Sequence, residues 1–104
     1  MPIFTRQTRS LFILLAGLSA TVAHAGPDAQ TRQLAASCSA CHGTDGHSVG
    51  GTPVLAGLER AHIVKQMQDF KSGARPATVM HRHAAGYSDP EIEKLADYFS
   101  ALKR

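Results

Sequence analysis

The sequence predicts an all-α fold in which three main helices are joined by long loops. Two segments of the C-terminal half repeat apolar residues at the three- and four-residue spacing of a helix that buries one face. Residues 43–57, by contrast, hold five glycines and one proline, which predicts an irregular loop. From residue 26 onward, no pattern in the sequence requires a β-sheet.

The first predicted helix opens at Pro27 and Asp28 and runs to residues 38–42. The middle helix is predicted over Leu58 to Ser72, with Gly73 as its stop. Its apolar stripe consists of Ile63, Met67 and Phe70. We therefore expect one face of this helix to lie in the core.

The last predicted helix has the clearest start signal. Ser88 and Glu91 have the spacing of a capping box, and Pro90 lies in the first turn. The predicted buried stripe consists of Ile92, Leu95, Ala96, Phe99 and Leu102. Lys103 and Arg104 would end this helix with the positive charge that its dipole favours.

Residues 1–25 have the features of a secretory signal. A charged start precedes the apolar run 11–22, and Ala-His-Ala at 23–25 is typical of a cleavage site. The alternative is a membrane anchor, but a span needs about 20 apolar residues, and this run is shorter and contains a serine and a threonine. We expect cleavage, which leaves a single domain over residues 26–104 with no membrane span.

Loss of Arg6 and Arg9 with the signal lowers the count of Lys and Arg from 11 to nine, against eight acidic residues. The net charge then falls from +3 to +1, and no block of basic residues remains that would follow phosphates along a nucleic acid. A domain of this size has a marginal core without a staple or cofactor. The composition therefore argues against nucleic-acid binding and for a bound group inside the fold.

Both cysteines of the chain lie in Cys38-Ser39-Ala40-Cys41, and His42 follows them directly. This spacing is typical of covalent c-type haem attachment. Sulfurs at i and i+3 lie about one helical turn apart on the same face, so they can add to the two vinyl groups on one edge of a porphyrin. His42 then faces the metal as its proximal ligand.

Three other interpretations of the two cysteines are a disulfide, a redox Cys-x-x-Cys motif and a zinc site. A redox motif should stand beside a βαβ pattern, but the preceding Leu34 to Ser37 is alanine-rich and lacks strand-like runs. Structural zinc needs four ligands, which could come only from the cysteines and two histidines such as His81 and His83. No second cysteine pair supports that site.

A metal-bound histidine normally donates its other N–H to a carbonyl or a carboxylate. The backbone around Pro53 is the candidate acceptor for His42, because residues 43–57 can wrap closely against the proximal face of the haem. The same loop could instead be a solvent-facing connection.

Met80 is the candidate for the second axial ligand, and a thioether there raises the reduction potential. It lies in the segment from residue 76 to residue 83, which has no clean amphipathic period and is expected to be a defined loop. Met67 falls in the apolar stripe of the middle helix, where methionine is most often part of the core. His81, His83, Met67 and an open site remain as alternatives.

The other polar candidates have weaker signals. His81 and His83 are expected at the surface, with a pH-sensitive partner contact as the alternative. Arg75 is a candidate for a charge-assisted bond to a haem propionate, or it is a plain exposed arginine. His47 and His62 are expected to be solvated.

Together these motifs resemble a small class I cytochrome c over residues 26–104. The matching segments are Cys38 to Gly43 with Asp45-Gly46, Pro53 to Gly57, Met80, Tyr87 to Ile92, and Leu95 to Phe99. Within that family, residues 69–80 followed by 85–89 resemble the cytochrome subunit of flavocytochrome c sulfide dehydrogenase. Some members carry two haem domains, whereas this chain has one Cys-x-x-Cys-His motif and room for one domain.

The resemblance implies the all-α cytochrome c fold around one covalent haem c. It implies Cys38 and Cys41 as thioether attachment points, His42 as proximal ligand and Met80 as distal ligand. It also implies a periplasmic protein that performs no bond chemistry and takes electrons from an FAD flavoprotein that oxidises sulfide. The electrons would pass to a soluble cytochrome. A free electron carrier to an oxidase or reductase is the alternative, and a haem enzyme or sensor with an open distal site is a further one.

Overall fold

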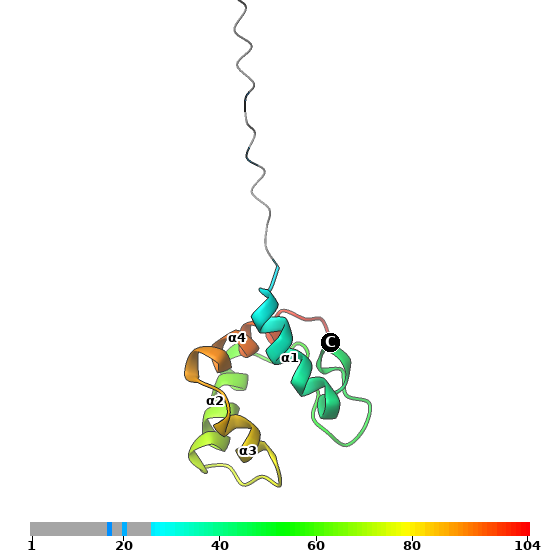
Figure 1. The fold of residues 1–104 in the computed structure, drawn as a ribbon. Coiled ribbons are helices and arrows are strands. Elements are labelled where there is room, and N and C mark those ends of the chain that lie inside the picture. Colours follow the sequence, from blue (N-terminus) through cyan, green and yellow to red (C-terminus); the bar gives the residue numbers. More distant parts are fainter. Residues whose placement is uncertain (1–16, 18–19, 21–25) are drawn as a thin grey trace, which may run out of the picture.

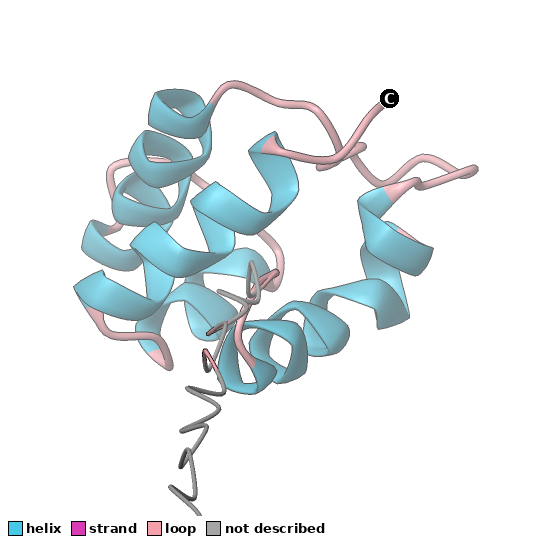
Figure 2. Ribbon diagram, turned by 90° about the horizontal axis from the view of Figure 1, so that it is seen from above, coloured by secondary structure: helices cyan, strands magenta, loops and turns pink. Residues whose placement is uncertain are grey.

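The computed structural model describes residues 17, 20 and 26–104, and these form helices and loops without a strand (Figure 2). The elements in chain order are α1 (Ala29–His42), a 3-10 turn η1 (Thr44–Gly46), α2 (Arg60–Ser72), α3 (Met80–Ala85) and α4 (Asp89–Ser100). The all-α prediction is confirmed, with one short helix more than the three main helices expected. The predicted signal peptide, apart from residues 17 and 20, lies outside the described residues.

Helix α1 begins where the sequence predicts. The carboxylate of Asp28 accepts a hydrogen bond from the backbone N–H of Thr31 at 2.7 Å, which satisfies one of the free donors of the first turn. The helix ends at Gly43, whose φ of 81° favours glycine. A Cβ atom there would lie 2.8 Å from the carbonyl oxygen of His47. The chain can therefore turn sharply just after His42.

Helix α2 begins at Arg60, two residues later than predicted, and ends as predicted before Gly73, which is left-handed at φ 81°. The loop predicted over residues 76–83 is wrong in its second half, because Met80 is the first residue of helix α3. The backbone N–H groups of Arg82 and His83 both donate to the carbonyl of Val79. Ala84 is fully buried, and α3 packs against α2.

The capping box predicted for α4 is present. Ser88 Oγ accepts from the backbone N–H of Glu91, and the Glu91 carboxylate accepts from the Ser88 N–H at 2.8 Å. The predicted end is wrong, because α4 stops at Ser100 and no basic residue lies in its last turn. The carbonyl of Phe99 instead accepts from the N–H of Gly57 at 2.9 Å, so a loop satisfies the helix end.

The core lies where four helices meet: α4 packs against both α1 and α2, and α2 also packs against α3 (Figure 1). The buried cluster consists of Ala35, Ile63, Met67, Ala84, Ile92, Leu95, Ala96 and Phe99. Three large side chains, Ile92, Leu95 and Phe99, have almost no exposure among the described residues. The core is thus small, and it includes Met67, as the sequence predicts. No helix among residues 26–104 combines the length and apolar character that a bilayer span requires.

Candidate haem site

The last turn of α1 presents Cys38, Cys41 and His42 together. Cys38 is half-buried and Cys41 is exposed, and neither forms a disulfide. Burial raises the pKa of the Cys38 thiol, so this sulfur stays protonated at neutral pH. The two thiols therefore lie one turn apart on an accessible helix end, as attachment to one edge of a porphyrin requires.

His42 is buried, with 7% exposure, and its Nδ1 lies 2.7 Å from the carbonyl oxygen of Pro53. A carbonyl only accepts, so Nδ1 carries the proton and donates, and Nε2 is the nitrogen with a free lone pair. This contact has the form that the sequence predicts for a histidine ligand and the backbone around Pro53. Loop 43–57 therefore lies against the imidazole at this point and is more than a solvent-facing connection.

The two methionines of the described chain occupy different environments. Met67 is 9% exposed and lies in the core on α2, whereas Met80 is partly buried at the start of α3 and packs at the edge of the core. Met80 is therefore the methionine that the core covers less completely.

Exposed apolar side chains stand beside both candidate axial positions. Val54 follows Pro53 and is 38% exposed, and Val79 precedes Met80 and is 49% exposed. Most large apolar side chains of the domain are at least partly covered. Val49, in the same loop as Val54, is fully exposed as well. A large apolar group that covered these segments would remove the valines from water, and this exposed apolar surface beside the two candidate axial ligands fits a haem.

The prediction that His81 lies at the surface is wrong. His81 is partly buried, and its Nδ1 is a buried nitrogen without a hydrogen-bond partner in the described structure. The physical reason is the helix α3, which places His81 and the buried Ala84 three residues apart on neighbouring positions of one face. His83 is exposed, as expected.

Arg75 is exposed, and its guanidinium carbon lies 5.2 Å from the centroid of the Phe70 ring. This cation–π contact holds the Arg75 side chain against the Phe70 ring. His47 is exposed but not simply solvated, because its Nε2 lies 2.7 Å from the carbonyl oxygen of Lys103. Sequence reasoning missed this contact, which joins residues 56 positions apart and leaves no local signal.

The zinc alternative lacks a cluster of ligands. Across residues 26–104, no three or more side chains of His, Cys, Asp or Glu come together as a metal site would require. The described fold and site thus define a class: a small all-α domain that attaches a haem through a Cys-x-x-Cys-His helix end.

Comparison with known proteins gives the same class. The chain belongs to the cytochrome c family, whose model matches residues 29–103. The cytochrome subunit of sulfide dehydrogenase from Chlorobaculum tepidum is 45% identical over 71 residues, which are 68% of this chain and 64% of that protein. Cytochrome c4 from Azotobacter vinelandii is 38% identical over 109 residues, covering 93% of this chain and 52% of that protein.

A solved structure of cytochrome c4 from Acidithiobacillus ferrooxidans superposes with a TM-score of 0.64 at 29% identity, over 71% of this chain and 51% of that chain. The chain thus spans about half to two thirds of the length of these relatives. The family carries covalent haem c, and the sequence holds one Cys-x-x-Cys-His motif, so this chain is a class I cytochrome c domain with one site for haem attachment.

Proposed function

We propose that this cytochrome is the haem subunit of a flavoprotein sulfide dehydrogenase and accepts single electrons from the flavin partner. The observation that carries the proposal is the 45% identity to the cytochrome subunit of sulfide dehydrogenase from Chlorobaculum tepidum. Residues 69–80, which include Met80, also resemble the corresponding segment of such cytochrome subunits, and this resemblance supports the proposal. An FAD flavoprotein would be the donor, and a soluble cytochrome would be the acceptor.

Each candidate residue has a role in this proposal. Cys38 and Cys41 would hold the haem through thioethers, and His42 would bind the iron through Nε2 while the Pro53 carbonyl orients its ring. Met80, at the start of α3, would be the second residue to hold the iron, and its thioether would raise the reduction potential. When bound, the haem supplies a one-electron iron couple.

Arg75 remains a candidate partner for a haem propionate. To bind a propionate, its guanidinium would either move away from the Phe70 ring or keep this contact and bind the propionate from the same position. An Arg75→Lys variant keeps the charge but loses the planar group.

We also propose that residues 1–25 are a cleaved signal and that the mature protein works in the periplasm. The support is the charged start, the apolar run and the small-residue site at 23–25.

A free electron carrier to an oxidase or reductase is the second candidate. Matches to cytochrome c4 and to cytochrome c-553 from Helicobacter pylori, which is 38% identical over 74 residues, support it equally. In that case the chain would have no stable flavoprotein partner. A haem enzyme or sensor with an open distal site is a third candidate, in which Met80 would not bind the iron.

The deciding experiment is a visible absorption spectrum of the tagged protein, purified gently from the periplasm of its native cell. Haem and flavin bands in one chromatographic peak, with haem reduction on addition of sulfide, are the expected result. A matched control is the isolated cytochrome, which sulfide should reduce much more slowly than the complex. Haem without flavin favours the free carrier, and a protein without haem overturns the roles of Cys38, Cys41 and His42.

A further inference from the structure

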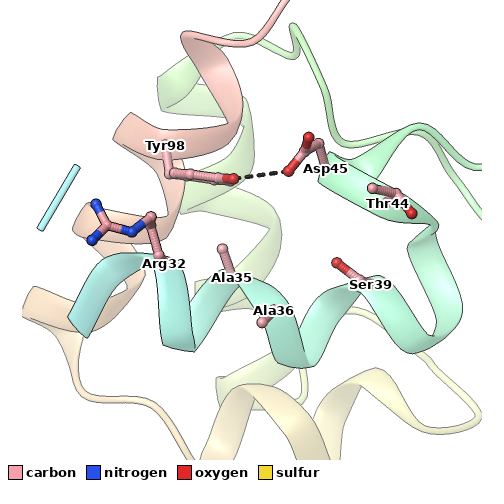
Figure 3. Close-up of a pocket in the computed structure, with 7 residues that line it drawn as sticks. All are labelled: Arg32, Ala35, Ala36, Ser39, Thr44, Asp45 and Tyr98. Carbon is pink, nitrogen blue, oxygen red and sulfur yellow. Dashed lines mark hydrogen bonds between the residues drawn. The ribbon is translucent and has the colours of Figure 1, made fainter. Parts of the chain in front are cut away.

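A hydrogen bond outside the proposed haem ligands joins two distant parts of the chain. The Tyr98 hydroxyl, on α4, donates to Oδ1 of Asp45, in η1, at 2.9 Å (Figure 3). The Tyr98 ring is partly buried and meets the buried Phe99 ring edge to face, with centroids 5.1 Å apart. The hydroxyl is therefore presented from a side chain that the core holds in place.

Asp45 is the one residue other than glycine with a positive φ in the described chain, at φ 52° and ψ 26°. The left-handed region is unfavourable for a residue with a Cβ atom, so surrounding contacts must hold it there. The next residue, Gly46, is equally constrained. A Cβ atom on Gly46 would lie 2.8 Å from Leu55 Cβ and 3.0 Å from the Phe99 ring.

The same turn sets the position of the segment that contacts His42. The carbonyl of Gly46 accepts from the N–H groups of Leu55 at 2.9 Å and Ala56 at 3.3 Å. Pro53, two residues before Leu55, offers the carbonyl that accepts from His42 Nδ1. Three consecutive links thus run from α4 to the turn, from the turn to residues 53–56, and from there to the imidazole.

We propose that Tyr98 is a positioning residue for His42. Its hydroxyl holds Asp45 and η1 in place, and η1 in turn fixes the Pro53 carbonyl that orients the imidazole. The proposal deepens the proposed function and rests on His42 as the proximal haem ligand.

The direction of the effect follows from the ligand chemistry. A strong hydrogen bond from Nδ1 makes the imidazole more basic, and a more basic ligand favours the ferric iron and lowers the reduction potential. Loosening the Pro53 carbonyl weakens that bond. Loss of the Tyr98 hydroxyl should therefore raise the potential.

The state of the Tyr98 phenol agrees with this role. Burial, together with the hydrogen bond to Asp45, raises the pKa of Tyr98 above its ordinary value. The phenol consequently remains protonated and able to donate at neutral pH.

The test compares Tyr98→Phe with Tyr87→Phe in the haem-loaded protein. Tyr87 is the matched control, because its hydroxyl is hydrogen-bonded at 2.7 Å to Ser37 Oγ on α1 rather than to a residue of η1. Three quantities are measured: the midpoint potential, the NMR shift of the His42 Nδ1 proton and the exchange rate of the Leu55 amide. Tyr98→Phe should raise the potential, move the proton signal and speed Leu55 exchange about fivefold.

Two further variants separate the effect of the Tyr98–Asp45 hydrogen bond from the effect of the left-handed backbone at Asp45. Asp45→Asn keeps an acceptor oxygen and tolerates the left-handed backbone, so it should retain the wild-type potential. Asp45→Gly removes the side chain and relieves the backbone, so it should behave like Tyr98→Phe even if that variant folds poorly.

Equal potentials and equal Leu55 exchange in Tyr98→Phe and Tyr87→Phe would overturn the positioning role. A lower stability of Tyr98→Phe with an unchanged potential would overturn it too, because a merely structural bond gives that result. Absence of haem from the wild-type protein would instead overturn the proposed function, and would be seen in the absorption spectrum before any variant is compared.

Discussion

The imidazole of His42 shows how one backbone atom can define the chemistry of a side chain. With Nδ1 at 2.7 Å from the Pro53 carbonyl, the neutral ring can carry its proton only on that nitrogen. Nε2 is left as the one metal-binding atom, and rotation of the ring would break a hydrogen bond of the buried residue. The imidazole is therefore held in one orientation, with Nε2 free to bind a metal.

The two methionines give a paired test of the distal ligand. Met80→Ala should abolish methionine coordination and lower the reduction potential, because the thioether stabilises the ferrous iron. Met67→Ala should leave both unchanged but destabilise the fold by about 2 to 5 kcal/mol, since it opens a cavity in the core. Proton NMR of the reduced protein detects a bound methionine, and thermal unfolding reports the stability.

The opposite pattern would contradict this assignment. If Met80→Ala kept a methionine-ligated spectrum while Met67→Ala lost it, the ligand would be Met67. If neither variant changed the spectrum, the distal site would be open or bound by a histidine.

The start of α1 depends on a titrating cap. The backbone N–H of Thr31 lowers the pKa of Asp28 below its ordinary value of 3.8. The folded pKa is depressed, so the stabilisation is complete above the unfolded value and is lost as the pH falls through the folded value. We expect Asp28→Ser, which keeps an N-cap without a titrating group, to lose less stability than the wild type between neutral pH and about pH 3.

Denaturant unfolding at the two pH values measures this difference for each protein. The comparison is internal, so other groups that titrate in acid cancel. Equal acid sensitivity of the two proteins would show that the Asp28 carboxylate does not contribute to the pH dependence.

The capping box of α4 gives a prediction about a second helix start. Ser88→Ala removes the acceptor for the Glu91 N–H and should cost about 1 kcal/mol of unfolding free energy. Ser100→Ala is the control at the other end of the same helix, where the hydroxyl donates to the Asp97 carbonyl, and should cost much less. Equal losses would mean that the capping box is not a main determinant of α4.

The missed helix α3 shows a limit of periodicity. Six residues make fewer than two turns, which is too short for an apolar stripe to appear, and histidine and arginine dominate the segment. Contact of the buried Ala84 with the rest of the core stabilises the turn. The long, strongly patterned helices α2 and α4 were predictable because each carries its own repeat and its own start or stop residue.

The described domain has a small core. Its buried cluster contains three alanines among eight residues, and a domain of this size is marginal without additional support. The Cys38→Ser and Cys41→Ser double variant, produced without haem, should therefore show little helical circular dichroism and no cooperative melting. The haem-loaded wild type is the reference, and a sharp, cooperative transition of the haem-free variant would contradict the expectation.

Long-range contacts hold the loops that surround the site. The carbonyl of Lys103 accepts from His47, the carbonyl of Phe99 accepts from Gly57, and Tyr98 donates to Asp45. All three tie loop 43–57 to α4 or to the residues after it, which run back toward this loop (Figure 1). Lys103 and Arg104 lie outside the helix for the same reason: the chain turns away to meet the loop.

Features that depend on near neighbours in the chain could be predicted from the sequence. The spacing of Cys38, Cys41 and His42, the caps at Asp28 and Ser88 and the repeats of α2 and α4 all act within one or two helical turns, where geometry is nearly constant. The existence of α3, the burial of His81 and the Tyr98–Asp45 bond required the folded structure. They arise from packing between segments that are far apart along the chain, and no local pattern records which distant side chain will lie across the core.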